Sequence, residues 1–180
     1  MSEISRRRRI ALALCGVLIA AYVLRPQISD ALVLRGDERL YRGRAVDATR
    51  YYRRAIDVDP SDGVAVDRYV FAAVGLRRAK LVHDAIDRAT RYLRLKPGDD
   101  VVRMDRAMAL RAVGDWGGAL ADFARVGIRE HDATALTLAG YAALARHQPL
   151  RAAQFWKAAL SIDDDFVAAR HALRRRISRR

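Results

Sequence analysis

The segment GRAVDATRYYRRAIDVDP at residues 43–60 decides the fold, because related segments follow it three times along the chain. These later copies are KLVHDAIDRATRYLRLKP at 80–97, GDWGGALADFARV at 114–126 and LRAAQFWKAALSIDDD at 150–165. An alanine marks the same point of each copy, at positions 48, 85, 119 and 152. The markers are 37, 34 and 33 residues apart. A period of about 34 residues is typical of a repeated pair of helices.

Another helical stretch precedes each copy, so we expect every repeat to hold a first and a second helix. Small residues stand at corresponding places of the first helices, namely Gly36, Ala73, Ala107 and Gly140. Small side chains here and at the alanine markers let paired helices approach closely. Larger side chains are expected to fill the space between neighbouring repeats, namely Tyr52, Phe123 and Trp156. Pro60 and Pro97 end two of the second helices, because proline cannot continue a helix.

This pattern resembles the tetratricopeptide repeat (TPR) family, most clearly through Gly36, Gly43, Ala48, Tyr52, Ala55 and Pro60. The resemblance spans residues 29–166 and implies an all-α solenoid of about four helical hairpins. The copies differ in detail: we place three extra residues at 63–65, and the third copy ends without a proline. Apolar residues at helical spacing then predict a capping helix within a basic segment at 167–180.

Charge is concentrated at the two ends of the chain. The net charge is +13, of which residues 1–25 contribute +4 and residues 170–180 contribute +6. The middle of the chain is therefore nearly balanced, which argues against nucleic acid as the main partner. The terminal run RRRISRR leaves open an alternative in which it binds nucleic acid or anionic lipid headgroups.

The apolar run IALALCGVLIAAYVL at residues 10–24 predicts a transmembrane signal anchor over 10–25. Its apolar members include Ile10, Leu14, Val17, Leu18 and Leu24. The run is short, because it covers about 22 Å of a hydrocarbon core of roughly 30 Å. A cleaved signal peptide is the alternative, and it would release an exported soluble repeat protein. A poor small-x-small cleavage site favours the anchor.

The arginines at 6–9 precede the apolar run and predict that residues 1–9 stay in the cytoplasm. Nearly all basic residues are arginine, which favours a bacterial source. The sequence therefore predicts a single-pass protein of a bacterial inner membrane, with its TPR domain in the periplasm.

No arrangement of residues predicts catalysis, a metal site or a cofactor. The four histidines, at 83, 131, 147 and 171, have no ligand spacing such as H-E-x-x-H. The glycines of GDWGG at 114–118 are typical of a turn and lack the Lys-Ser/Thr of a phosphate loop. We therefore expect a binding protein without enzymatic activity.

The TPR resemblance implies a concave groove, lined by the first helices, that binds a peptide or helix segment of a partner protein. The residues transferred to it are Val70, Val74, Arg77, Met104, Met108, Arg111, Thr137 and Tyr141. Methionine adapts to varied partners and arginine binds carboxylates, so this groove would suit acidic or amphipathic segments. The alternative is that these residues are ordinary core and solvated surface. The absence of asparagine excludes the family's clamp for a terminal carboxylate.

Together these features predict a membrane-anchored scaffold or adaptor. Its expected role is to bind protein partners in envelope or secretion-related assembly.

Overall fold

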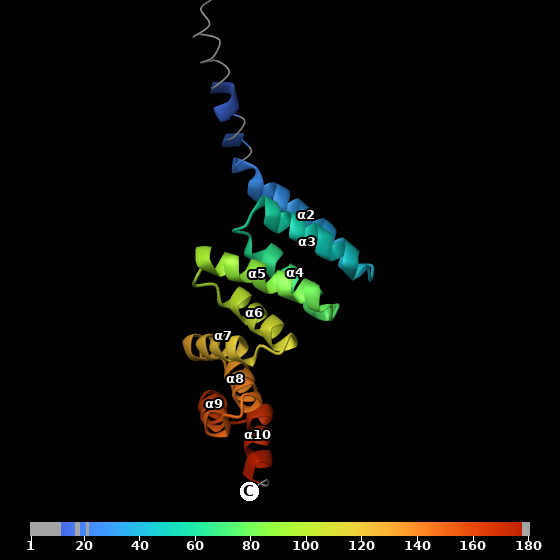
Figure 1. Ribbon diagram of the computed structural model, residues 1–180. Coiled ribbons are helices and arrows are strands. Elements are labelled where there is room, and N and C mark those ends of the chain that lie inside the picture. Colours follow the sequence, from blue (N-terminus) through green and yellow to red (C-terminus); the bar gives the residue numbers. More distant parts are fainter. Residues whose placement is uncertain (1–11, 17–18, 21, 178–180) are drawn as a thin grey trace, which may run out of the picture.

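The computed structural model describes residues 12–16, 19, 20 and 22–177, and its described secondary structure is entirely helical (Figure 1). The all-α prediction is therefore confirmed. The long helices are α2 (Arg25–Tyr41), α3 (Ala45–Val58), α4 (Gly63–Gly75), α5 (Ala79–Leu95), α6 (Asp100–Ala112), α7 (Trp116–Arg129), α8 (Ala133–Ala145), α9 (Pro149–Ile162) and α10 (Val167–Ile177).

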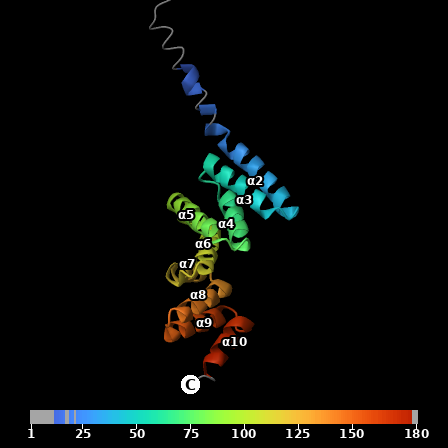
Figure 2. The same cartoon turned by 45° about the vertical axis from the view of Figure 1, so that its right-hand side comes forward.

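Successive helices pack as hairpins, each made of a first and a second helix: α2 with α3, α4 with α5, α6 with α7, and α8 with α9. The hairpins stack in a row, and α10 packs against α9 at the end of the row (Figure 1). Figure 2 shows α5 and α7 along one side of this row and α4 on the other.

One residue with a left-handed backbone closes the turn of each hairpin. Glycine takes this place at Gly43 and Gly114, with φ of 72° and 82°. Arg77 and His147 take it in the other two hairpins, with φ of 52° and 58°. Such a residue ends a helix sharply, because its N–H reaches back to carbonyls of the last turn.

An aspartate caps the first helix of each of the last three hairpins: Asp62 for α4, Asp99 for α6 and Asp132 for α8. Asp99 Oδ1 accepts a hydrogen bond from Val102 N at 3.0 Å. Asp99 Oδ2 accepts one from the hydroxyl of Tyr92, in the preceding second helix, at 2.6 Å. Burial, and then this hydrogen bond, raises the pKa of Tyr92, so its hydroxyl remains a donor well into the alkaline range. One carboxylate therefore starts a helix and ties it to the previous hairpin.

Asp62 likewise caps a helix and joins the first two hairpins. Its Oδ1 caps α4 by accepting from Ala65 N at 3.0 Å, and its Oδ2 accepts from the Ser29 hydroxyl of α2 at 2.5 Å. Ser29 is fully buried, so this bond is shielded from water.

The capping aspartates correct the predicted repeat register. Helices α4, α6 and α8 each begin one residue after the cap and have 13 residues. Residues 63–65 are therefore the ordinary start of α4 and not the three extra residues of the second repeat. Helix α5 has 17 residues, whereas α3, α7 and α9 have 14. The three extra residues therefore lie in the first turn of α5. Counted from the cap, Val70 and not Ala73 is the equivalent of Ala107 and Gly140.

In two hairpins, a glycine of the first helix lies under an aromatic ring of the second helix. A β-carbon at Gly36 would overlap the ring of Tyr52, and one at Gly140 would overlap the indole of Trp156. Both rings are buried and each makes a hydrogen bond within its hairpin. The Tyr52 hydroxyl donates to Asp37 at 2.7 Å, and Trp156 Nε1 donates to the carbonyl of Thr137 at 3.2 Å.

The predicted membrane anchor over 10–25 is not found. Within residues 12–16, 19, 20 and 22–177, no helix has both the length and the apolar composition needed to cross a membrane. Leu14 and Leu24 are exposed, while Ile10, Val17 and Leu18 lie outside the described residues. The apolar run has 15 residues, and a spanning helix needs about 20. The predicted location, a bacterial inner membrane with the TPR domain in the periplasm, is therefore wrong.

We predict that Asp99→Ala lowers the free energy of unfolding by about 2–4 kcal/mol, because it removes the α6 cap and leaves the Tyr92 hydroxyl without its acceptor. Asp115→Ala is the matched control, because Asp115 caps α7 through Gly118 N alone, and it should cost about 1 kcal/mol. Urea unfolding of the full chain measures both. Equal losses would show that the Tyr92 contact does not hold the hairpins together.

Candidate functional site

The candidate site lies on the first helices α4 and α6, which pack side by side. Residues five, nine and twelve places after a capping aspartate share one helix face, because these spacings bring side chains round to the same side. In α4 they are Asp67, Phe71 and Val74, and in α6 they are Met104, Met108 and Arg111. We call these six residues, with Asp105, the first-helix face.

Exposure supports this register. Phe71 is 65% exposed, whereas its neighbour Val70 is 1% exposed and belongs to the core. Met104 and Met108 are half-buried against the core cluster of the last two hairpins. The face thus presents a large aromatic ring and two thioether side chains.

The structure brings together only part of the predicted groove. Val74, Met104, Met108 and Arg111 share the first-helix face. Arg77 lies in the turn after α4, one residue beyond its C-cap Leu76. The sequence reasoning missed Asp67, Phe71 and Asp105. The capping aspartates Asp62 and Asp99 are the signal that would have found them.

The predicted residues of α8 stand apart from the other two helices. Helix α8 packs chiefly on α7 and α9, and a β-carbon at Gly127 of α7 would overlap Leu136 of α8. Thr137 is buried, with its carbonyl bonded to Trp156. Tyr141 is 42% exposed and its ring meets that of Trp156 edge to face, with centroids 5.5 Å apart.

Two carboxyl groups meet at the centre of the first-helix face. Burial, and then the negative charge of Asp67 on α4, raise the pKa of Asp105 on α6 to about 7. The Oδ2 atom of Asp105 is buried and has no hydrogen-bond partner among the described residues. The centre of the face therefore carries a group whose charge changes near neutral pH.

An acidic hollow of about 560 Å³ continues from this centre to the start of α8. Its lining residues are Gly98, Asp99, Asp100, Val101, Met104, Asp105, Val126, Glu130 and Asp132. Five of these are acidic and none is basic. Arg129 reaches Asp100 from outside, with 3.2 Å between Nε and Oδ2. Val101 is 67% exposed at the rim, so the hollow offers apolar contact beside its carboxylates.

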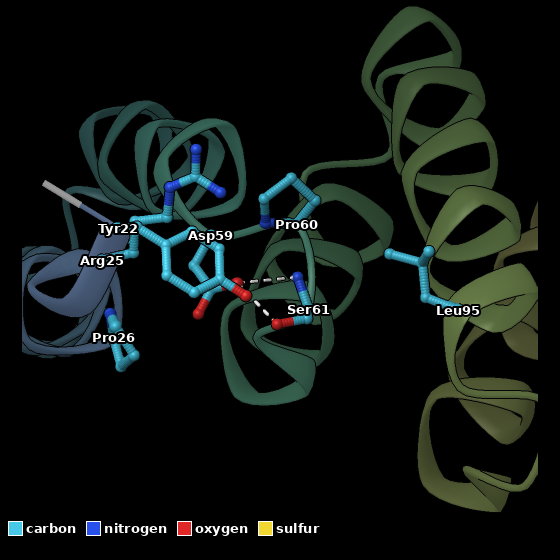
Figure 3. Close-up of a pocket in the computed structure, with 7 residues that line it drawn as sticks. All are labelled: Tyr22, Arg25, Pro26, Asp59, Pro60, Ser61 and Leu95. Carbon is cyan, nitrogen blue, oxygen red and sulfur yellow. Dashed lines mark hydrogen bonds between the residues drawn. The ribbon is translucent and has the colours of Figure 1, made fainter. Parts of the chain in front are cut away.

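A smaller hollow of about 330 Å³ lies where α2 begins, beside the turn at residues 59–61 (Figure 3). The guanidinium of Arg25 lies over the ring of Tyr22, 5.0 Å from its centroid. The Asp59 carboxylate already accepts from the N–H and hydroxyl of Ser61, at 2.9 and 2.7 Å. The acidic group of this hollow is thus engaged in its own turn.

The histidines do not form a site in the described part of the chain. His83, His131, His147 and His171 are all exposed, and two of them occupy turns with left-handed backbone. No group of three or more metal-ligating side chains occurs among the described residues.

Solved structures with this fold are TPR proteins or their relatives. MamA from Desulfovibrio magneticus RS-1, residues 41 to the end, matches with TM-score 0.67 at 18% identity over 79% of each chain. TTC0263, a thermophilic TPR protein of Thermus thermophilus, matches with TM-score 0.64 at 18% identity over 93% of this chain and 96% of its own. PilF of Pseudomonas aeruginosa matches with TM-score 0.65 at 17% identity over 86% of this chain and 71% of its own.

No protein-family model and no curated protein matches the sequence. The structural likeness therefore carries the assignment, and it shows that the chain has a TPR fold, which is consistent with a protein-interaction scaffold.

The raised pKa of Asp105 predicts a pH-dependent stability. The native state holds this proton more tightly than the unfolded chain, so the contribution of Asp105 to stability falls as pH rises from about 4 to about 7. The loss amounts to about 1.4 kcal/mol per unit of pKa difference. Asp105→Asn should remove this loss of stability with rising pH, so the variant should be more stable than wild type at pH 8.

Urea unfolding of wild type and of Asp105→Asn, at pH 5 and at pH 8, measures this effect. Asp87→Asn, at an exposed position of α5, is the control and should leave the pH dependence unchanged. Parallel pH profiles for wild type and Asp105→Asn would contradict the assignment.

Proposed function

We propose that the protein is a scaffold that binds a partner protein through the first-helix face. The bound segment is an extended peptide or a helix that carries both apolar and basic side chains. The carrying observation is the combination on α4 and α6 of the exposed Phe71, the half-buried methionines and the paired carboxyl groups of Asp67 and Asp105.

Apolar contact supplies the affinity in this proposal. Phe71 and Val101 are 65% and 67% exposed, and burying a large apolar side chain contributes about 1.5–3 kcal/mol. Met104 and Met108 share the first-helix face with Phe71, and their flexible thioethers can adapt to the shape of a partner.

Charge supplies the specificity. The sequence predicts an acidic or amphipathic partner segment, because it transfers Arg77 and Arg111 to the groove beside the methionines. Arg111 lies on the face, but Arg77 does not, and the hollow beside Met104 has five acidic lining residues and no basic one. A lysine or arginine of the partner would meet the paired carboxyl groups of Asp67 and Asp105, so complementarity favours a basic segment.

The proposal predicts that binding strengthens with pH. A cation beside Asp105 favours its ionised form, so binding releases the proton that the free protein holds near neutral pH. Affinity should therefore rise between pH 6 and pH 8, while lysine on the partner remains charged throughout this range. No feature of the described residues ties this binding to envelope or secretion-related assembly.

A labelled amphipathic peptide of leucine and lysine tests the proposal by fluorescence anisotropy, with a leucine–glutamate peptide for comparison. The full chain should bind the lysine peptide, and Asp67→Asn combined with Asp105→Asn should weaken it about tenfold, equal to 1.4 kcal/mol. Phe71→Ser should also weaken binding and leave stability unchanged, because its ring is exposed.

Asp87→Asn, exposed on α5, is the control and should bind like wild type. Unchanged binding by the double variant, or an affinity that is the same at pH 6 and pH 8, would contradict the proposal.

A further inference from the structure

We propose a second binding site, on the second helices, that takes an acidic segment of a partner protein. It is a groove of about 390 Å³ between α3 and α5, with α4 beneath. We call it the α3–α5 groove, and its lining residues are Val46, Thr49, Arg50, Arg53, Tyr69, Arg78, Lys80, Leu81 and Asp84. None of these residues belongs to the first-helix face.

The longer first turn of α5 forms part of this groove. Helix α5 is three residues longer than α3, α7 and α9, and the extra length lies in its first turn. Three of the lining residues, Arg78, Lys80 and Leu81, are the N-cap and first turn of this helix. The departure from the repeat thus places two cations and an apolar side chain opposite α3.

Four cations line the groove, and three of them make no ion pair with a described residue. Arg50 makes an exposed ion pair with Asp47 at 3.1 Å. Arg53, Arg78 and Lys80 are exposed and have no ion pair with any described residue. Unpaired cations close together repel one another, and an anion seated between them relieves this repulsion.

The one acid of the groove is already neutralised. Asp84 accepts a hydrogen bond from the Tyr69 hydroxyl at 2.6 Å and one from Arg88 Nε at 2.9 Å. Burial alone would raise the pKa of Asp84, but these two hydrogen bonds, together with the positive charges of Arg88 and Arg53, outweigh burial and lower the pKa. Arg88 is also held by Asp57 at 2.6 Å. Asp84 therefore has its hydrogen bonds within the floor of the groove, and it makes no ion pair with a lining cation.

The apolar part of the lining selects among anions. Val46 and Leu81 lie on the two walls, and the Tyr69 side chain is 1% exposed beneath them. A free phosphate or a nucleic-acid backbone would leave these apolar groups without contact. A protein segment with an apolar side chain between carboxylates satisfies both the walls and the cations, so we assign this occupant to the groove.

Charge reversal in the groove tests the assignment with the labelled leucine–glutamate peptide as probe. Arg53→Glu combined with Lys80→Glu should weaken its binding to the full chain at least about tenfold. Both side chains are exposed, so circular dichroism and the melting temperature should not change. Arg91→Glu combined with Arg94→Glu is the matched control, because it makes the same charge change on exposed positions of α5 outside the groove.

The control should retain nearly all of the binding. Equal losses in the two double variants would overturn the assignment, because they would show attraction to the net positive charge of the whole chain. Absence of binding by wild type would also overturn the assignment.

Competition with other polyanions tests the occupant. If duplex DNA or phosphatidylserine vesicles displace the peptide, and if their own binding is lost in the groove variant alone, the groove belongs to that polyanion instead. Asp67→Asn with Asp105→Asn should leave this peptide's binding unchanged, which separates the groove from the first-helix face.

Discussion

A carboxylate shared between two hairpins sets the register of this solenoid. Asp99 caps α6 with one oxygen and accepts the Tyr92 hydroxyl with the other, and Asp62 joins α4 to Ser29 of α2 in the same manner. Repeat proteins depend on contacts between neighbours, so a contact of this kind determines which residues of each first helix face outward. The acidic and apolar first-helix face and the position of Asp105 beside Asp67 both follow from that register.

Two surfaces of opposite chemistry result from the stack. The first-helix face of α4 and α6 combines carboxyl groups with apolar side chains, and the α3–α5 groove combines cations with apolar walls. They share no residue, although α4 contributes to both surfaces, through the face residues Asp67, Phe71 and Val74 and through Tyr69 in the groove. A scaffold with such surfaces could hold a basic segment and an acidic segment at the same time, which a single groove cannot do.

The sequence was sufficient for the fold because the repeat signal is strong. A period near 34 residues and alanine markers predicted the paired helices, and the structure has them. The register of the second repeat was harder to predict, because alanine is common throughout helices and Ala73 is a poor marker. Aspartates two residues after Pro60 and Pro97 are better markers, since a cap is tied to the start of a helix.

Other features depend on three-dimensional packing and could not be read from the sequence. Asp67 and Asp105 come together only because α4 and α6 pack side by side. The pKa of Asp105 depends on burial that no local pattern reveals. The membrane prediction failed for another reason. Its apolar run of 15 residues has the flanks of an anchor but falls short of the length that a spanning helix needs.

The most direct test of this account is to locate a bound basic segment by nuclear magnetic resonance. A leucine–lysine peptide with a spin label should broaden the methyl signals of Met104 and Met108, which lie on the first-helix face. The methyl signals of Leu81, in the α3–α5 groove, should remain sharp. Broadening of Leu81 with unaffected methionine signals would contradict the account, because it would place the basic segment on the second helices.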